Sequence, residues 1–146
     1  MENGLLQWMK ANTGRWLISE RKQVFNSNKV LDFKIITVDE TKEHVKLEFK
    51  KGTTVSLPID FWMFDRVIAK LETKKDFVVI GARLQPPYPK GSLEESVWTK
   101  PYPRKTSIKV SPHICDILNH YGIVSYDYTT DPNSGRTVQG AKITRK

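Results

Sequence analysis

Apolar and polar residues alternate most clearly in residues 45–50, where Val45, Leu47 and Phe49 are separated by charged side chains. A period of two predicts a strand with one buried face. The β-branched run 30–38 precedes this segment, and residues 53–57 follow the turn at Lys51 and end at Pro58. These three segments therefore predict three strands of an antiparallel meander.

A helical pattern follows in residues 61–72, where Phe61, Phe64, Ile68 and Leu71 recur at the spacing of one helix face. This amphipathic helix is expected to pack on the meander. A short helix is also predicted for residues 5–11, whereas residues 19–25 fit a helix or a strand equally well. The continuous apolar run 77–82 predicts a strand that is buried on both faces.

The C-terminal pattern predicts a helix and a hairpin. Ser111 is the expected N-cap, Pro112 the first helical residue, and Gly122 the residue that ends the helix. Residues 123–128 and 138–144 are rich in β-branched or aromatic side chains, and the segment 130–135 between them is rich in turn formers. We therefore expect one helix followed by a β-hairpin.

This order of helix, glycine stop and basic hairpin resembles the end of a winged-helix DNA-binding unit. The resemblance covers at most the last third of the chain. It implies a helix in the DNA major groove whose polar positions face the DNA, namely His113, Asp116, Asn119 and His120. A carboxylate at Asp116 would be repelled by phosphate in that arrangement.

Residues 85–105 differ in character, because five of the eight prolines of the chain lie there. Prolines lack an N–H and exclude regular sheet. Two similar segments, 87–90 and 101–104, each place a tyrosine between prolines and a cation after them. Between them, Ser92 and Glu95 have the spacing of a capping box for a short helix over 92–99.

The predicted fold class is thus α+β: an antiparallel β-meander packed on a helix, a proline-rich segment, and a winged-helix-like C-terminal helix plus β-hairpin. The expected segments are the meander half (1–84), the connecting loops (85–105) and the helix with its basic hairpin (106–146). They are expected to form one compact domain overall.

The formal net charge is +8 at pH 7, and residues 83–146 contain ten Lys or Arg against five Asp or Glu. A basic excess favours polyanionic partners, here nucleic acid, with DNA favoured over RNA. The cations would neutralise phosphates and the aromatic rings would stack on bases. The candidate nucleic-acid-binding residues are Tyr88, Lys90, Trp98, Tyr102, Arg104, Lys105, Lys109, Arg136, Lys142, Arg145 and Lys146.

An alternative is catalytic. Glu48 and Lys50 lie two apart on a predicted strand and so share a face, and Asp39, or as the second choice Asp32, precedes them. This pattern resembles the acidic and lysine core of the PD-(D/E)xK nuclease family, although Val38 replaces its proline. The resemblance implies Mg²⁺ bound by the two carboxylates, with Lys50 beside the reacting phosphate. Such charges are also ordinary on a solvent-facing strand.

Other function classes have less support. The single cysteine, Cys115, excludes an intrachain disulfide, and neither a signal peptide nor a membrane span is expected. We expect a cytoplasmic protein without a membrane partner, and no oligomeric state is indicated. Whether it is an enzyme stays open: a binding protein without a cofactor is favoured, and a nuclease with Mg²⁺ is the alternative. Residues 86–89 fit an extended ligand for a protein partner, which would make the chain an accessory subunit. A restriction, repair or mobile-element system would suit a DNA-binding module of this kind.

Overall fold

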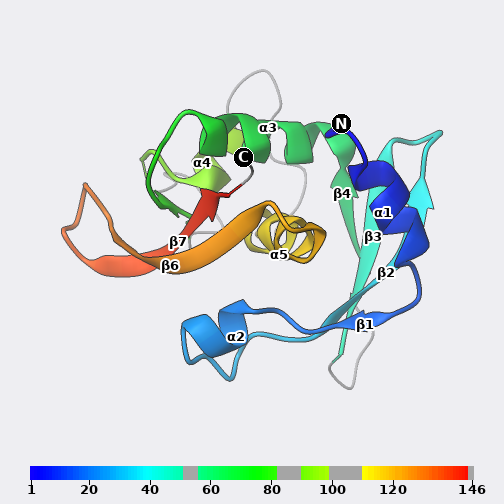
Figure 1. Cartoon of the computed structure of the whole chain (residues 1–146), viewed down its shortest axis with the longest axis horizontal. Helices are drawn as coiled ribbons and strands as arrows, with labels where there is room; N and C mark the ends of the chain where they lie inside the picture. The colour runs from blue at the N-terminus through cyan, green and yellow to red at the C-terminus, as the bar shows by residue number, and fades with distance from the viewer. Residues whose placement is uncertain (51–55, 82–89, 99–109, 145–146) are drawn as a thin grey trace. The chain divides into compact units, whose positions relative to one another are not determined.

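The computed structural model describes residues 1–50, 56–81, 90–98 and 110–144 (Figure 1). Two compact units divide the chain, Met1–Asp65 and Arg66–Lys146. Each unit combines helices with an antiparallel sheet, so the predicted α+β class is confirmed. The segments 1–84, 85–105 and 106–146 stay a prediction, because most of the middle one lies outside the described residues.

The first unit builds a four-stranded sheet in the order β1-β2-β3-β4, with every neighbouring pair antiparallel. Its elements are α1 (Leu5–Ala11), β1 (Trp16–Leu17), α2 (Arg21–Val24), β2 (Phe33–Asp39), β3 (His44–Phe49) and β4 (Ser56–Asp60), followed by α3 (Phe61–Glu72), which continues into the second unit. The predicted meander is β2, β3 and β4, and the bounds of α1 and α3 are those expected.

Two details of this sheet differ from expectation. The strand predicted to end at Pro58 continues to Asp60. β4 is the edge strand, and an edge position tolerates a residue that has no N–H to donate. The ambiguous segment after β1 forms the single turn of helix α2.

The core of the first unit lies between α1 and one face of the sheet. Gly14 N–H donates to the Ile35 carbonyl at 2.8 Å, which fixes the end of α1 beside β2. Fully buried side chains of α1 and of strands β2, β3 and β4 are Leu5, Met9, Ile35, Val45, Leu47 and Ile59. Burial of such side chains stabilises the unit by about 2 kcal/mol each.

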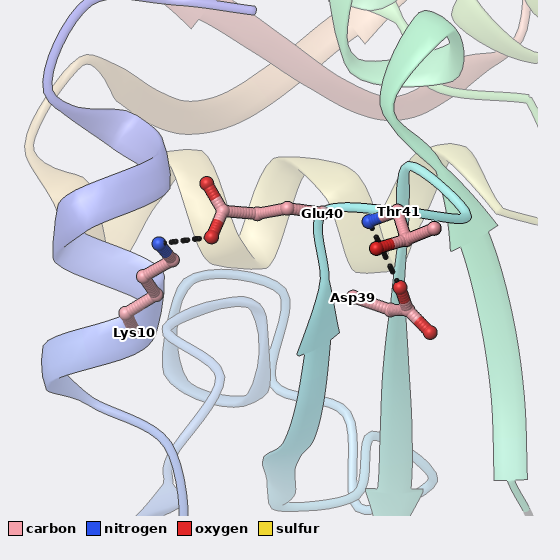
Figure 2. Close-up of polar contacts among 4 residues, drawn as sticks. All are labelled: Lys10, Asp39, Glu40 and Thr41. Carbon is pink, nitrogen blue, oxygen red and sulfur yellow. Dashed lines mark hydrogen bonds and ion pairs between the residues drawn. The ribbon is translucent and has the colours of Figure 1, made fainter.

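Polar contacts close the turn between β2 and β3 (Figure 2). Lys10, in the last turn of α1, forms an ion pair with Glu40 in that turn. Asp39 accepts hydrogen bonds from the backbone N–H of Thr41 at 3.0 Å and of Lys42 at 2.9 Å. The carboxylate of Asp39 therefore has a structural role at the end of the hairpin.

The second unit contains a three-stranded antiparallel sheet in the order β5-β7-β6. Its elements after α3 are β5 (Val78–Val79), α4 (Leu93–Val97), α5 (Ser111–Tyr121), β6 (Val124–Thr130) and β7 (Thr137–Ile143). The predicted C-terminal helix and β-hairpin are confirmed. None of the described helices is long and apolar enough to cross a membrane.

β5 is shorter than the predicted strand over 77–82, although Val78, Val79 and Ile80 are buried as expected. Gly81 interrupts the strand because its φ of +101° is favourable only for glycine. A Cβ at this position would also lie 2.9 Å from the Cβ of Glu94. The glycine therefore allows the chain to pass close to α4.

The capping box predicted for α4 is present. Ser92 Oγ accepts the Glu95 N–H at 3.1 Å, as expected for the N-cap. Glu95 Oε1 accepts the N–H of Gly91 at 2.9 Å, one residue before the N-cap. The first interaction pairs a backbone donor that a helix start leaves unpaired, whereas in the second Glu95 accepts the N–H of the residue before the N-cap instead of the N-cap N–H itself.

The N-cap predicted for α5 is wrong. Ser111 is the first helical residue, and Val110 occupies the N-cap position without a side-chain cap. The buried carboxylate of Glu94 replaces that cap: its Oε1 accepts the N–H of Val110 at 3.2 Å and of Ser111 at 3.1 Å. Glu94 also accepts the indole N–H of Trp98. A negative charge at a helix N-terminus is favourable, so Glu94 joins α4 to α5.

At the C-terminal end of α5, Gly122 has a φ of +103° and ends the helix as predicted.

We predict that Glu94→Ala lowers the free energy of unfolding by about 3 kcal/mol, because three donors lose a buried acceptor. Urea unfolding followed by tryptophan fluorescence measures this change. Glu95→Ala, which removes only the more exposed part of the capping box, is the matched control and should cost about 1 kcal/mol. Equal effects of the two variants would contradict the role of Glu94.

Candidate nucleic-acid interface

The turn between β6 and β7 is held by the carboxylate of Asp131. Its Oδ1 accepts the N–H of Asn133 at 2.9 Å, and its Oδ2 accepts the Ser134 hydroxyl at 3.0 Å. The Asp131 N–H donates to the Arg136 carbonyl at 2.8 Å, and the Asp131 carbonyl accepts the Gly135 N–H at 2.8 Å. This network orders the turn, which lies at the end of the hairpin away from α5 (Figure 1).

Two predicted cations lie at this turn. The side-chain N–H of Asn133 donates at 3.2 Å to the carbonyl of Lys90, which is 43 residues away in sequence. The backbone of Lys90 is therefore held at the same turn as Arg136, and both residues are exposed. Neither has an ion-pair partner within the described ranges. Both positive charges are thus available at one end of the hairpin.

The hydrogen bonds of the turn also favour the ionised form of Asp131. The backbone N–H of Asn133 stabilises its ionised carboxylate and lowers the pKa of Asp131 below 3.8. At neutral pH the turn therefore carries one carboxylate, engaged by turn donors, and the cations Lys90 and Arg136. The local balance is positive.

Lys142 does not belong to this pair of cations. It lies opposite Ser125, six residues after Arg136 along β7, which corresponds to about 20 Å of extended strand. Its Nζ is 5.6 Å from the ring centroid of Phe77. The hairpin thus presents its cations at both ends.

Trp98 is only 8% exposed and donates its indole N–H to Glu94, so its ring contributes to the packing of α4 rather than to a surface. Within α5, Asp116 is 2% exposed and accepts the Tyr126 hydroxyl at 2.6 Å. The expectation that Asp116 faces DNA is therefore wrong. Seven of the eleven residues of α5 are buried, so this helix is mainly a core element.

The remaining predicted residues lie outside the described ranges: Tyr88, Tyr102, Arg104, Lys105, Lys109, Arg145 and Lys146. The extended segment 86–89, proposed above for a protein partner, also lies there. Their roles stay predictions.

The residues of the catalytic alternative are not brought together. Asp39 pairs with His44 at one end of the β2–β3 hairpin, whereas Glu48 pairs with Lys34 near the other end. Glu48 is four positions after His44 along β3, which places the backbones of Asp39 and Glu48 about 13 Å apart along the sheet. Two carboxylates that share a Mg²⁺ ion each hold an oxygen about 2 Å from it, so Asp39 and Glu48 do not share one in this arrangement.

Glu48 and Lys50 have other neighbours. Glu48 Oε2 lies 4.0 Å from Lys34 Nζ, and Lys50 Nζ lies 5.8 Å from the ring centroid of Trp16. Among the described residues, no group of three or more His, Cys, Asp or Glu side chains is placed to hold a metal. The nuclease and accessory-subunit alternatives stay predictions of the sequence.

The residue that sequence reasoning missed is Trp16. Its side chain is 40% exposed, and Lys34 Nζ lies 4.5 Å from its ring centroid. The signal in the sequence was weak, because β1 has only two residues and its alternation is too short to recognise. The pairing of Trp16 with Lys34 in β2 is visible only in the folded sheet.

Comparison of the chain with family models, curated proteins and solved structures finds no match.

We predict that acid weakens the hairpin turn. A lowered pKa in the folded state means that the ionised Asp131 stabilises the turn at neutral pH. This contribution is present above the unfolded pKa and is lost as the pH falls through the lower, folded pKa. The amide resonances of Asn133 and Arg136, followed by NMR, should titrate with a midpoint below 3.8.

Asp131→Asn should abolish that titration at Asn133 and Arg136. Asp39 provides an internal control, because the backbone N–H of Lys42 likewise lowers the pKa of Asp39. Its titration, read at the Lys42 amide, should persist in the Asp131 variant. A midpoint at or above the ordinary aspartate value would contradict the assignment.

Proposed function

We propose that the protein is a nucleic-acid-binding module and that the β6–β7 turn contacts the phosphate backbone. One observation carries the proposal: the exposed cations Lys90 and Arg136, from distant parts of the sequence, lie at one ordered turn and have no described ion-pair partner. The net charge of +8 supports it, because cations that are not paired with acids attract a polyanion.

The chemistry of the turn suits phosphate. An arginine guanidinium binds phosphate oxygens through two parallel hydrogen bonds, and a lysine ammonium adds a compact charge. Hydrogen bonds within the turn keep Asp131 occupied, which reduces its competition for Arg136. Contacts of this type provide affinity without base specificity. DNA as the favoured nucleic acid and a cytoplasmic location are parts of this proposal, which includes no catalytic step.

The test is the affinity of the full chain for a duplex and a single-stranded DNA oligonucleotide, measured by fluorescence anisotropy between about 50 and 200 mM salt. Affinity should fall steeply as salt rises. Arg136→Ala and Lys90→Ala should each weaken binding and reduce the slope of log affinity against log salt by about one. Lys22→Ala, at an exposed lysine of α2, removes the same charge elsewhere and is the matched control.

The expected ranking is that both hairpin variants bind more weakly than Lys22→Ala. If affinity does not respond to salt, or if the three variants bind alike, the turn is not a phosphate contact and the proposal fails.

A further inference from the structure

We infer that the face of the first sheet opposite its buried row contains a second binding site, built around Trp16, whose ligand is single-stranded nucleic acid. The proposal rests on the proposed function for the class of ligand, but its residues belong to the first unit and are independent of the hairpin. The four residues that define the site are Trp16, Lys34, Glu48 and Lys50, and we call it the Trp16 site.

Strand pairing determines which face carries the site. Residues directly opposite each other on adjacent strands point to the same side of a sheet. Trp16 pairs with Lys34, and Lys34 pairs with Glu48. The neighbouring pair, Leu17 with Phe33, is buried in the core. Trp16, Lys34 and Glu48 therefore lie together on the face opposite that core.

Lys50 extends the same face. It lies two residues beyond Glu48, and its N–H donates to the Asp32 carbonyl at 3.0 Å, which continues the pairing past the end of β3. Its Nζ is 5.8 Å from the Trp16 ring centroid, and Lys34 Nζ is 4.5 Å from it. Two ammonium groups thus lie close to one exposed indole ring.

This combination suits a nucleotide, which carries a flat base and a phosphate. An indole ring provides a stacking surface for any base, and the flanking lysines provide partners for the phosphates on either side. The long side chains of Lys34, in β2, and Lys50, just past the end of β3, reach the ring from separate segments. A base can therefore stack on the ring once either lysine moves to a phosphate.

A single strand fits better than a duplex, because bases in a duplex are already stacked on their neighbours and must be extruded to reach an aromatic side chain. A lipid surface fits less well. Insertion into a bilayer interface needs a continuous apolar face, whereas the neighbours of Trp16 on its own face are charged. Ile18, 63% exposed, is the nearest exposed apolar residue in the sequence.

The site contains one opposing charge. Glu48 Oε2 lies 4.0 Å from Lys34 Nζ and so competes with a phosphate for Lys34. Removal of this competing charge is therefore expected to raise the affinity for a single strand. Glu48→Gln should strengthen single-strand binding about twofold to threefold, since it removes a repulsive charge and releases Lys34. Weaker binding of this variant would contradict the site.

The decisive experiment compares a thymidine oligonucleotide of about 15 nucleotides with a duplex of similar length, using the full chain and anisotropy. Trp16→Ala should weaken single-strand binding about tenfold and change duplex binding less than about twofold. Trp16→Phe should restore much of the loss, because phenylalanine still stacks. Ile18→Ala, the apolar control, should bind like the wild type. Thermal melts of all variants confirm that they are folded.

Intrinsic fluorescence gives a second readout. Stacking of a base on an indole ring quenches its emission, so oligonucleotide binding should quench the wild type more than Trp16→Phe, in which the other three tryptophans remain. Quenching of the same size in both proteins would overturn the site.

The results of these binding experiments distinguish this proposal from the proposed function. If Trp16→Ala binds the single strand like the wild type, or loses duplex and single-strand affinity equally, the Trp16 site is wrong whether or not Arg136→Ala weakens binding. If neither nucleic acid binds at all, both proposals fail. Binding to vesicles of anionic lipid that depends on Trp16 and Ile18, without single-strand binding, would show a membrane contact instead.

Discussion

The two-residue period of paired strands is the constraint on which both units depend. In the first sheet, Phe33 and its partners Leu17 and Phe49 form one row, and Lys34 with its partners Trp16 and Glu48 forms the next. Adjacent rows point to opposite faces, so the same register that buries Phe33 exposes the charged row. A slip by one residue would exchange the two faces. Core and candidate site are therefore fixed together.

The second unit uses the same constraint and adds buried polar contacts. Val124 and Tyr126 are buried on one face of the β6–β7 hairpin, and the Tyr126 hydroxyl reaches the buried Asp116 of α5. Glu94 then joins α4 to the N-terminus of α5. Buried polar groups are costly unless they are paired, so these contacts favour one packing of the helices over others. The hairpin turn with Lys90 and Arg136 is positioned by this framework.

Local patterns in the sequence were sufficient where the physical cause is local. The alternation in residues 45–49, the helical spacing from Phe61 to Leu71 and the stop at Gly122 each involve residues a few positions apart, and the structure confirms all three. The N-cap of α5 could not be predicted in this way, because its acceptor, Glu94, is 17 residues from Ser111. Likewise, Asp39 and Glu48 are far apart because of the register in which β2 and β3 pair. A sequence motif lists residue types and does not specify that register.

Counting charges leads to a proposal for the class of ligand but not for the places where it would bind. Lys10 and Lys142 carry the same formal charge as Lys90, yet Lys10 pairs with Glu40 and Lys142 lies over Phe77. What distinguishes the hairpin turn is that an ordered network holds cations without neutralising them. What distinguishes Trp16 is its exposure. Because 40% of the residue is exposed, it contributes about 2 kcal/mol less to the free energy of folding than a fully buried tryptophan would. Because adjacent residues of a strand point to opposite faces, Trp16 lies on the charged face while Leu17 is buried, and its exposed ring is accessible to the ligand proposed above.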